Sequence, residues 1–387
     1  MTPIARRELI GGLCCCSALA LAGCAASVPS GRVEPGYKPL LSTDEGGLWQ
    51  TMEKAEGEIK RSHNLIRDAE LNAYVRDVVC RLGDAHCSDL RIYIMRTPYF
   101  NANMAPNGMM QVWTGLLLRT QNEAQLAAIL GHEMGHYLER HSLQRWRNTR
   151  DTSDFAAVVG LGGIYTLPVT VAALASIPAF SRDQERRADE IGLELMTKAG
   201  YRPLEAANVW AQLVAEDELA KDRNPRNVFS ASHPSSQERM MTMRAKAEAS
   251  GASSNDTFAD RYHQRVAGIR RLLLQDELKL RQYDRSLVVL HNIAAGQGDG
   301  EDGEIAYFIG EVHRLRDEGD DRSRALDAFD RATARLDCPA ETYRSIGLVR
   351  LRDGDHAAAD AAFARYLDLK PDASDREMVR SYIQNRG

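Results

Sequence analysis

The motif H-E-x-x-H, present as His132-Glu133-Met-Gly-His136, constrains this chain more than any other feature. The segment that carries it is typical of a helix, because Asn122 can cap its first turn with Gln125 three residues on, and apolar residues follow at helical spacing. On such a helix the two imidazoles stand one turn apart and can bind one metal ion. Glu133 lies about 100° round the helix, within reach of a water on that ion. Metal-assisted hydrolysis needs this arrangement.

The motif alone leaves a zinc ion one ligand short, because a catalytic zinc usually has three protein ligands and an open fourth position. A second helical pattern over residues 180–196 offers Glu185 as the third ligand. Asp189 lies one turn further along the same face, where its carboxylate could accept the outward N–H of a ligating histidine and fix that ring. We therefore expect a His-His-Glu site that holds one Zn²⁺ per chain.

These motifs and several others resemble, in order, the zinc metallopeptidase family that includes HtpX, the CAAX prenyl endopeptidases and the beta-barrel assembly-enhancing protease BepA. The matching segments are Asn101-Ala, Gly115-Leu-Leu, His132-Glu-Met-Gly-His, Arg140-His, Ser181-Arg-Asp-Gln-Glu-Arg-Arg-Ala-Asp-Glu-Ile-Gly and His233-Pro. The resemblance implies a zincin-type (gluzincin) fold with zinc bound by His132, His136 and Glu185. It also implies that Glu133 is the catalytic general base.

Three interpretations of His233 stay open. It could fill the fourth zinc position in the resting enzyme, or it could stabilise the oxyanion of the reaction. It could also be an ordinary loop histidine ahead of a proline that starts the next helix. Tyr137 and Arg239 are further candidates for the oxyanion donor, and nothing in the sequence chooses among them.

The first residues have the pattern of a bacterial lipoprotein. Residues 1–23 place Arg6 and Arg7 ahead of a short apolar run that ends in Leu21-Ala-Gly-Cys24, as in a signal peptide. This ending resembles a lipobox, which implies lipidation of Cys24, and the alanine after it favours the outer membrane. Residues 24–43 are rich in proline and glycine, which indicates an extended tether. The paired arginines also allow a twin-arginine signal.

Three cysteines besides Cys24 remain after signal removal. Cys80 and Cys87 flank a short loop at the end of the helix predicted over residues 71–82. A disulfide between them suits this spacing and an oxidising compartment, and two isolated thiols are the alternative. Cys338 is left without an assigned role.

A small sheet is predicted directly before the zinc helix. Residues 90–95 favour a strand, and residues 99–104 and 109–113 favour a hairpin about Pro106-Asn-Gly. An extended substrate commonly adds to a sheet edge beside the helix in zinc peptidases of this kind. The edge expected here is residues 109–114.

Residues 155–180 carry no charge and are long enough to span a bilayer. Glycines and prolines interrupt the segment, however, and a tethered lipoprotein gains little from a second anchor. We expect two apolar helices near the active-site cleft, with a membrane span as the alternative.

The C-terminal part is rich in leucine, alanine and arginine and shows no strand pattern. Several of its residues follow the tetratricopeptide spacing of 34 residues, most clearly Tyr343, Gly347, Ala359, Phe363 and Pro371. A less regular copy includes Gly310, Ala325, Phe329, Ala332 and Pro339. We expect an α-solenoid of tetratricopeptide-like repeats over residues 262–387, which would bind a protein or peptide.

The whole chain is therefore expected to be α+β and mostly helical. Its domains would be the signal peptide 1–23, the tether 24–43, a peptidase domain 44–250, a linker 251–261 and the repeat domain 262–387. The net charge of −5 gives no reason to expect nucleic acid as a partner.

The function expected is that of a periplasmic, membrane-tethered zinc metalloendopeptidase in quality control or assembly of envelope proteins. Misfolded or unfolded envelope proteins would be its substrates, and the barrel assembly machinery of the outer membrane could contact the repeats. The alternative is an assembly factor or chaperone that binds envelope proteins through its repeats, with proteolysis secondary.

Overall fold

A computed structural model of the chain describes residues 31–149, 179–220, 228–233, 237–251, 254, 256–296 and 302–384. The predicted signal peptide, the predicted lipidation site Cys24 and nearly all of the uncharged segment 155–180 lie outside these residues. The helices and strands described below all lie in one structural unit, Arg32–Gly387. Among the helices described, none combines the length and the apolar character that a membrane crossing requires.

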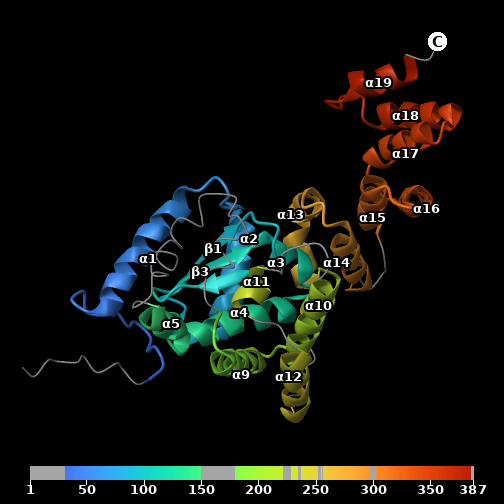
Figure 1. Cartoon of the computed structure of the whole chain (residues 1–387). Helices are drawn as coiled ribbons and strands as arrows, with labels where there is room; N and C mark the ends of the chain where they lie inside the picture. Colours follow the sequence, from blue (N-terminus) through green and yellow to red (C-terminus); the bar gives the residue numbers. More distant parts are fainter. Residues whose placement is uncertain are drawn as a thin grey trace, which may run out of the picture. The chain divides into compact units, whose positions relative to one another are not determined.

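Two helices open the predicted peptidase region, residues 44–250: α1 at Asp44–Arg61 and α2 at Ala69–Leu82 (Figure 1). Thr43 caps α1 and Asp68 caps α2, each by accepting a backbone N–H of the first turn. The helix predicted over residues 71–82 is thus confirmed as α2.

The segment before α1 is folded onto the domain, which shortens the tether predicted over residues 24–43. Val33 is buried and its N–H donates to the carbonyl of Leu138 at 2.8 Å. The hydroxyl of Tyr37 donates to the carboxylate of Glu45 at 2.9 Å. Proline and glycine dominate the composition of this stretch, but two large side chains anchor it, so a free tether would extend no further than about Arg32.

A disulfide joins Cys80, near the end of α2, to Cys87, with the two Cα atoms 4.8 Å apart. A short 3-10 turn, η1 at Asp84–His86, lies between them. Cys338 is a free, half-buried thiol.

The sheet has three strands, β1 at Arg91–Met95, β2 at Ala102–Met104 and β3 at Met109–Trp113, in the order β1-β3-β2. β2 and β3 are antiparallel, which confirms the hairpin, while β1 runs parallel to β3. The expectation that residues 109–114 form an edge was wrong: β3 is the central strand and all five of its residues are buried. A hairpin pattern does not reveal on which side a third strand will pair.

The two outer strands differ in how they are covered. Backbone hydrogen bonds join Ile66 to Ile94 of β1, and Asn64 to Arg96, the residue that follows β1. β2 lies against α4, the helix that carries the H-E-x-x-H motif. The edge beside that helix is therefore β2.

After β3 the chain forms α3 at Thr114–Arg119, α4 at Glu123–Leu138 and α5 at His141–Thr149. α4 begins as the sequence predicts, with the side chain of Asn122 accepting the N–H of Gln125. α9 at Arg182–Lys198 begins at a capping box formed by Ser181 and Gln184.

α4 and α9 approach each other closely because glycines face across the contact. A Cβ on Gly135 would lie 2.8 Å from the carbonyl oxygen of Ala188, and one on Gly192 would lie 2.8 Å from the backbone nitrogen of His132. Gly131 lies opposite Gly192 in the same contact. This approach brings the motif on α4 beside Glu185 on α9.

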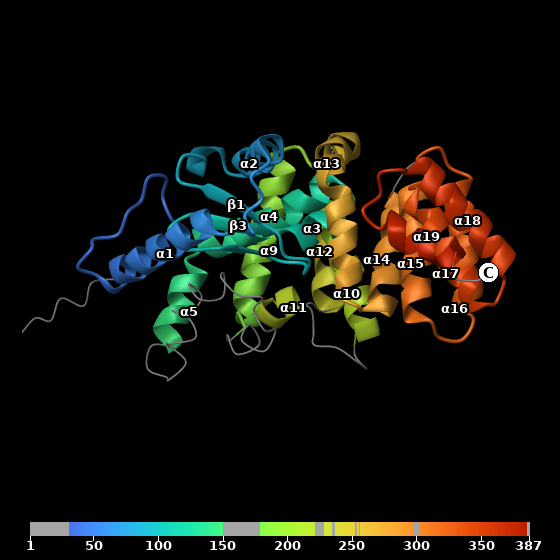
Figure 2. The ribbon, with the colours of Figure 1, turned by 90° about the horizontal axis from the view of Figure 1, so that it is seen from above.

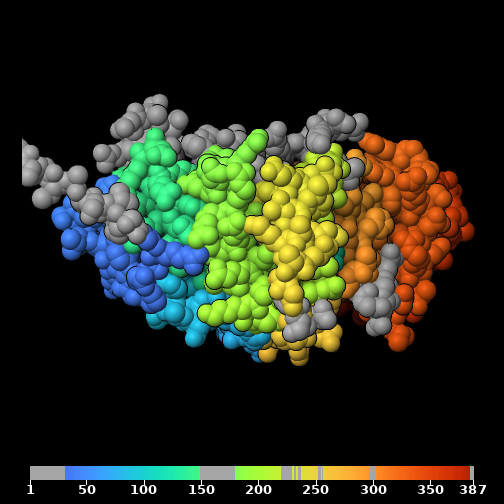
Figure 3. Space-filling view, turned by 90° about the horizontal axis from the view of Figure 1, so that it is seen from below, coloured from blue at the N-terminus to red at the C-terminus, as the bar shows by residue number. Residues whose placement is uncertain are grey.

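Three more helices complete the peptidase region: α10 at Leu204–Ala220, α11 at Val228–Ser232 and α12 at Gln237–Ala249. α12 packs on α10 and touches α9. Viewed from below, α9 (green) and α12 (yellow) lie side by side at the surface (Figure 3).

The described residues that follow are mostly helical, as expected. The helices are α13 at Ala259–Lys279, α14 at Tyr283–Gly296, α15 at Gly303–Arg316, α16 at Asp321–Thr333, α17 at Glu341–Arg352, α18 at His356–Leu369 and α19 at Arg376–Gln384 (Figure 2). α15 pairs with α16, and α17 pairs with α18. In each pair a glycine admits a phenylalanine ring, Gly310 for Phe329 and Gly347 for Phe363, because a Cβ at either glycine would overlap the ring.

α13 packs into the core of the peptidase region. Arg119 of α3 is almost completely buried and pairs at 2.8 Å with Glu216 of α10 and at 2.8 Å with Glu277 of α13. The hydroxyl of Tyr262, also on α13, bonds to the carbonyl of Leu117. A buried arginine between two glutamates, together with an aromatic side chain, thus joins α13 to α3 and α10.

Candidate metal centre

Four buried side chains from three parts of the chain converge at the contact between α4 and α9. His132 and His136 come from α4, Glu185 from α9, and His233 follows the end of α11. Each offers one donor atom, and these atoms all lie within 4.8 Å of one another. The structure therefore brings together the three predicted ligands and the residue whose function the sequence left open.

The distances among these donor atoms match the edges of a small tetrahedron. Nε2 of His132 lies 3.1 Å from Nε2 of His136 and 3.2 Å from Nδ1 of His233. Oε1 of Glu185 lies 3.4 Å from Nε2 of His136 and 3.0 Å from Nδ1 of His233. Ligand atoms about 2.0–2.1 Å from a tetrahedral zinc would be about 3.3 Å apart. Three imidazoles and a carboxylate at these distances fit one zinc ion.

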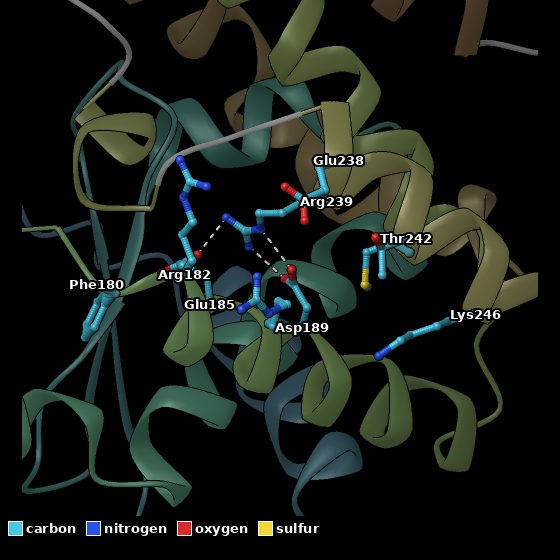
Figure 4. A pocket seen from close by; sticks show the side chains of 10 residues that line it. Phe180, Arg182, Glu185, Asp189, Glu238, Arg239, Thr242 and Lys246 are labelled. Carbon is cyan, nitrogen blue, oxygen red and sulfur yellow. Dashed lines mark hydrogen bonds and ion pairs between the residues drawn. The ribbon is translucent and has the colours of Figure 1, made fainter.

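Asp189 occupies the predicted supporting position. Its carboxylate lies 2.9 Å from Nδ1 of His132, opposite the nitrogen that faces the cluster. Arg239 of α12 donates to the same carboxylate at 2.8 and 2.7 Å, and it pairs with Glu185 at 2.6 Å (Figure 4). Arg239 therefore supports two acidic residues of the site, a role that the sequence did not indicate.

The charged groups around the site favour the ionised forms of Glu185 and Asp189. Burial alone would raise the pKa of Glu185, but the histidines around it, His233 first, hold that pKa well below its usual range. Burial also acts on Asp189, where Arg239 and the hydrogen bond with His132 outweigh it and lower the pKa. Both groups are thus anionic at neutral pH and can attract a cation.

Glu133 is placed differently from these two carboxylates. It is buried beside His132, and burial raises the pKa of its carboxyl. Its Oε1 makes no hydrogen bond within the described residues and lies 3.6 Å from Nε2 of His233. A carboxylate oxygen without a hydrogen-bond partner among the described residues, at the rim of the cluster, suits proton transfer.

His136 has two aromatic neighbours that the motifs did not predict. The ring of Phe180 stacks on it with centroids 3.9 Å apart, and Nδ1 of His141 lies 3.0 Å from its Nδ1. The sequence signal for His141 was present in the Arg140-His segment but carried no assigned role. Tyr137, a candidate oxyanion donor, instead lies beside His86, with ring centroids 6.2 Å apart.

A cavity of about 300 Å³ lies between α9 and α12, beside the cluster. Glu185, Asp189 and Arg239 form its inner wall, and Arg182, Glu238 and Lys246 lie around it (Figure 4). It therefore reaches the residues that support the metal site.

Known proteins resemble this chain over the same region. The model of peptidase family M48 matches residues 65–247. The mitochondrial metalloendopeptidase OMA1 of Schizosaccharomyces pombe is 34% identical over 173 residues, which cover 43% of this chain and 50% of that protein.

Two bacterial relatives extend the comparison. A putative beta-barrel assembly-enhancing protease of Vibrio cholerae is 25% identical over 206 residues, 49% of this chain and 42% of that protein. The beta-barrel assembly-enhancing protease of Escherichia coli is 22% identical over 250 residues, 57% of this chain and 50% of that protein. The chain spans no more than half the length of each of these relatives. The family match covers the cluster and the helices that build it, so residues 65–247 resemble the peptidase domain of family M48, a zinc-dependent metallopeptidase family.

Proposed function

We propose that this chain is a zinc metalloendopeptidase that hydrolyses unfolded or misfolded proteins of a bacterial envelope. The observation that carries the proposal is the buried cluster of His132, His136 and Glu185 with Glu133 at its rim. The names of its relatives, a metalloendopeptidase and beta-barrel assembly-enhancing proteases, support the same activity.

In this mechanism His132, His136 and Glu185 would hold the zinc ion. When bound, zinc polarises the scissile carbonyl and acidifies the attacking water. Glu133 would take the proton of that water and then pass it to the leaving amine. Asp189, held by Arg239, would keep the proton of His132 on Nδ1, so that its Nε2 stays available to the metal.

The substrate would be presented by the sheet edge next to the zinc helix. β2 lies against α4, and its three residues can pair with an extended peptide through backbone groups alone. Recognition by backbone pairing depends little on side chains, which suits an enzyme that removes many different unfolded proteins.

The decisive experiment compares two substitutions on α4 in purified mature protein. His136→Ala should lose bound zinc, because it removes a ligand. Glu133→Gln should keep about one zinc per chain but lose peptide hydrolysis by about a hundredfold or more, because it removes the base. Elemental analysis and cleavage of unfolded casein, with and without chelator, measure both. Equal zinc content in the parent and in His136→Ala would refute the assignment.

The predicted signal peptide and lipobox support a periplasmic enzyme anchored through Cys24, with the outer membrane as its place. Replacing Cys24 by serine should then release the protein from the membrane fraction of cells. Continued sedimentation of the Cys24→Ser protein with membranes would contradict a lipid anchor.

We infer a second role for the C-terminal helices, as tetratricopeptide-like repeats that bind envelope proteins or their assembly machinery. The specific support is that Gly310 with Phe329 and Gly347 with Phe363 repeat one packing arrangement in successive helix pairs. If binding is the main cellular role, Glu133→Gln should complement a deletion strain, whereas an obligatory protease would fail to do so.

A further inference from the structure

The two histidines of the H-E-x-x-H motif are supported in different ways. Nδ1 of His132 is bonded to the carboxylate of Asp189, which Arg239 holds in turn. Nδ1 of His136 faces another imidazole, with Nδ1 of His141 at 3.0 Å. His136 and His141 are both buried. His141 is thus positioned relative to His136 as Asp189 is relative to His132.

The positions of the protons on the two imidazoles determine which ring donates the hydrogen bond between them. A neutral imidazole carries one N–H, and a histidine that binds metal through Nε2 carries that proton on Nδ1. Nδ1 of His136 must then donate, and Nδ1 of His141 must accept. This pairing places the proton of His141 on its own Nε2.

His141 reaches this place because the helix breaks just before it. In a continuous α-helix the residue five positions on points about 140° away from the first, so it could not face His136. Arg140 instead has φ of 56°, in the left-handed region that residues other than glycine seldom adopt. The break separates α4 from α5 and turns His141 back toward α4.

The segment before α1 and the start of that helix hold Arg140 in this conformation. Its guanidinium forms a buried ion pair with Glu45 and lies over the ring of Tyr37, 4.1 Å from the centroid. Tyr37 donates its hydroxyl proton to Glu45 as well. Arg140 therefore has two partners that are also bonded to each other, so its left-handed backbone is over-determined by its surroundings, as backbone strain near functional sites usually is.

We propose that His141 is a positioning residue for the metal centre: its Nδ1 accepts the Nδ1–H of His136 and fixes that ligand's tautomer and ring orientation. The Arg140 turn, with Glu45 and Tyr37, holds His141 in place. The proposal rests on the function proposed above, namely that His136 binds zinc.

The test compares His141→Phe, which keeps a ring but has no acceptor, with His141→Asn, whose Oδ1 falls near the position of Nδ1. His141→Phe should bind zinc about 10–100-fold more weakly in competition with a chelator, since losing such a support typically has this effect. His141→Asn should recover most of that affinity. At saturating zinc His141→Phe should lower kcat while KM stays constant, because the peptide edge is untouched. Asn148→Ala, an exposed position on α5, serves as the control.

The absorption spectrum of the Co²⁺-substituted protein gives a readout that a merely structural role would not change. It should shift in His141→Phe and return in His141→Asn, because it reports ligand geometry. If His141→Phe does not fold, His141→Gln is used in its place. The amide of glutamine reaches the position of Nε2 rather than that of Nδ1, so this variant also lacks an acceptor for His136. Zinc affinity and spectrum equal to the parent in His141→Phe, or equal losses in both variants, would overturn the proposal. A parent that binds no zinc would instead refute the proposed function.

Discussion

His233 is the residue whose role depends most on geometry, because its Nδ1 lies 3.2 Å from Nε2 of His132 and 3.0 Å from Oε1 of Glu185. At these distances its imidazole would fill the fourth position of a bound zinc ion and exclude the catalytic water. We expect His233→Ala to keep zinc through the remaining three ligands and to cleave unfolded protein faster than the parent.

The competing role of His233 gives the opposite result. If it stabilises the oxyanion, His233→Ala should slow cleavage about a hundredfold or more. Initial rates on unfolded casein, compared at equal zinc content, separate the two roles. An unchanged rate would contradict both.

At the residue scale the sequence was sufficient where spacing along one helix determined the geometry. His132, His136 and Glu133 follow from one turn of α4, and Glu185 with Asp189 from one turn of α9. Arg239 and His141 could not be placed in this way, because the first reaches across from another helix and the second depends on the left-handed backbone at Arg140. Neither contact corresponds to a regular spacing of residues along one helix, so a sequence pattern cannot reveal it.

At the scale of elements, the contact between α4 and α9 should be sensitive to a single methyl group. Gly135→Ala places its Cβ 2.8 Å from the carbonyl oxygen of Ala188 and 2.9 Å from the Cα of Ala188, so backbone must move. We expect a loss of about 1–3 kcal/mol in the free energy of unfolding and weaker zinc binding.

A matched glycine on another helix supplies the control. A Cβ on Gly268 of α13 meets nothing within 4 Å, so Gly268→Ala should stabilise the protein by about 0.5–1 kcal/mol. Urea unfolding of both variants tests the comparison. Equal effects of the two substitutions would show that the close contact is not what makes Gly135 necessary.

Glu56 should make the attachment of α1 to the sheet depend on pH. Its carboxylate accepts hydrogen bonds from Arg91 at 2.8 and 2.7 Å and from Tyr93 at 2.6 Å. Burial alone would raise its pKa, but these two partners lower it from 4.5 to about 2. Because the folded pKa is the lower one, the stabilisation is complete above about pH 4.5 and is lost as the pH falls toward about 2.

Replacing Glu56 by glutamine removes this titration. At neutral pH Glu56→Gln should lower the free energy of unfolding by about 1–3 kcal/mol, and the difference from the parent should shrink below pH 4.5. Urea titrations across this range measure it. Parallel pH profiles for parent and variant would contradict the role of Glu56.

The elements themselves were predictable to different degrees. Capping residues such as Asn122 and apolar spacing fixed the starts of the long helices, whereas the order of the three strands could not be read from local patterns. β3 became central because β1, earlier in the chain, pairs with it from the other side. The sheet edge beside α4 is consequently β2.

For the whole molecule, the fate of a truncated chain depends on where the cut falls. A chain that ends at residue 296 keeps α13 and α14, and it should fold, bind zinc and cleave small unfolded peptides. A chain that ends at residue 261 leaves Arg119 without Glu277 and should be less stable by about 3–5 kcal/mol, because a buried charge loses a partner.

Circular dichroism, zinc content and peptide cleavage compare the two truncations. Equal stability of both chains would mean that α13 does not contribute to the peptidase fold. Composition marked a linker at residues 251–261, but only the structure reveals that the next helix carries a buried partner for Arg119.

The cavity between α9 and α12 has a consequence for inhibition. A small molecule bound there would touch Asp189 and Arg239, whereas no residue of β2 lines the cavity. Such a compound would disturb Glu185, the proposed metal ligand, without competing for the proposed peptide edge, so it would lower kcat and leave KM unchanged. Raising the substrate concentration would not relieve this inhibition, in contrast to that by any compound that occupies the peptide edge.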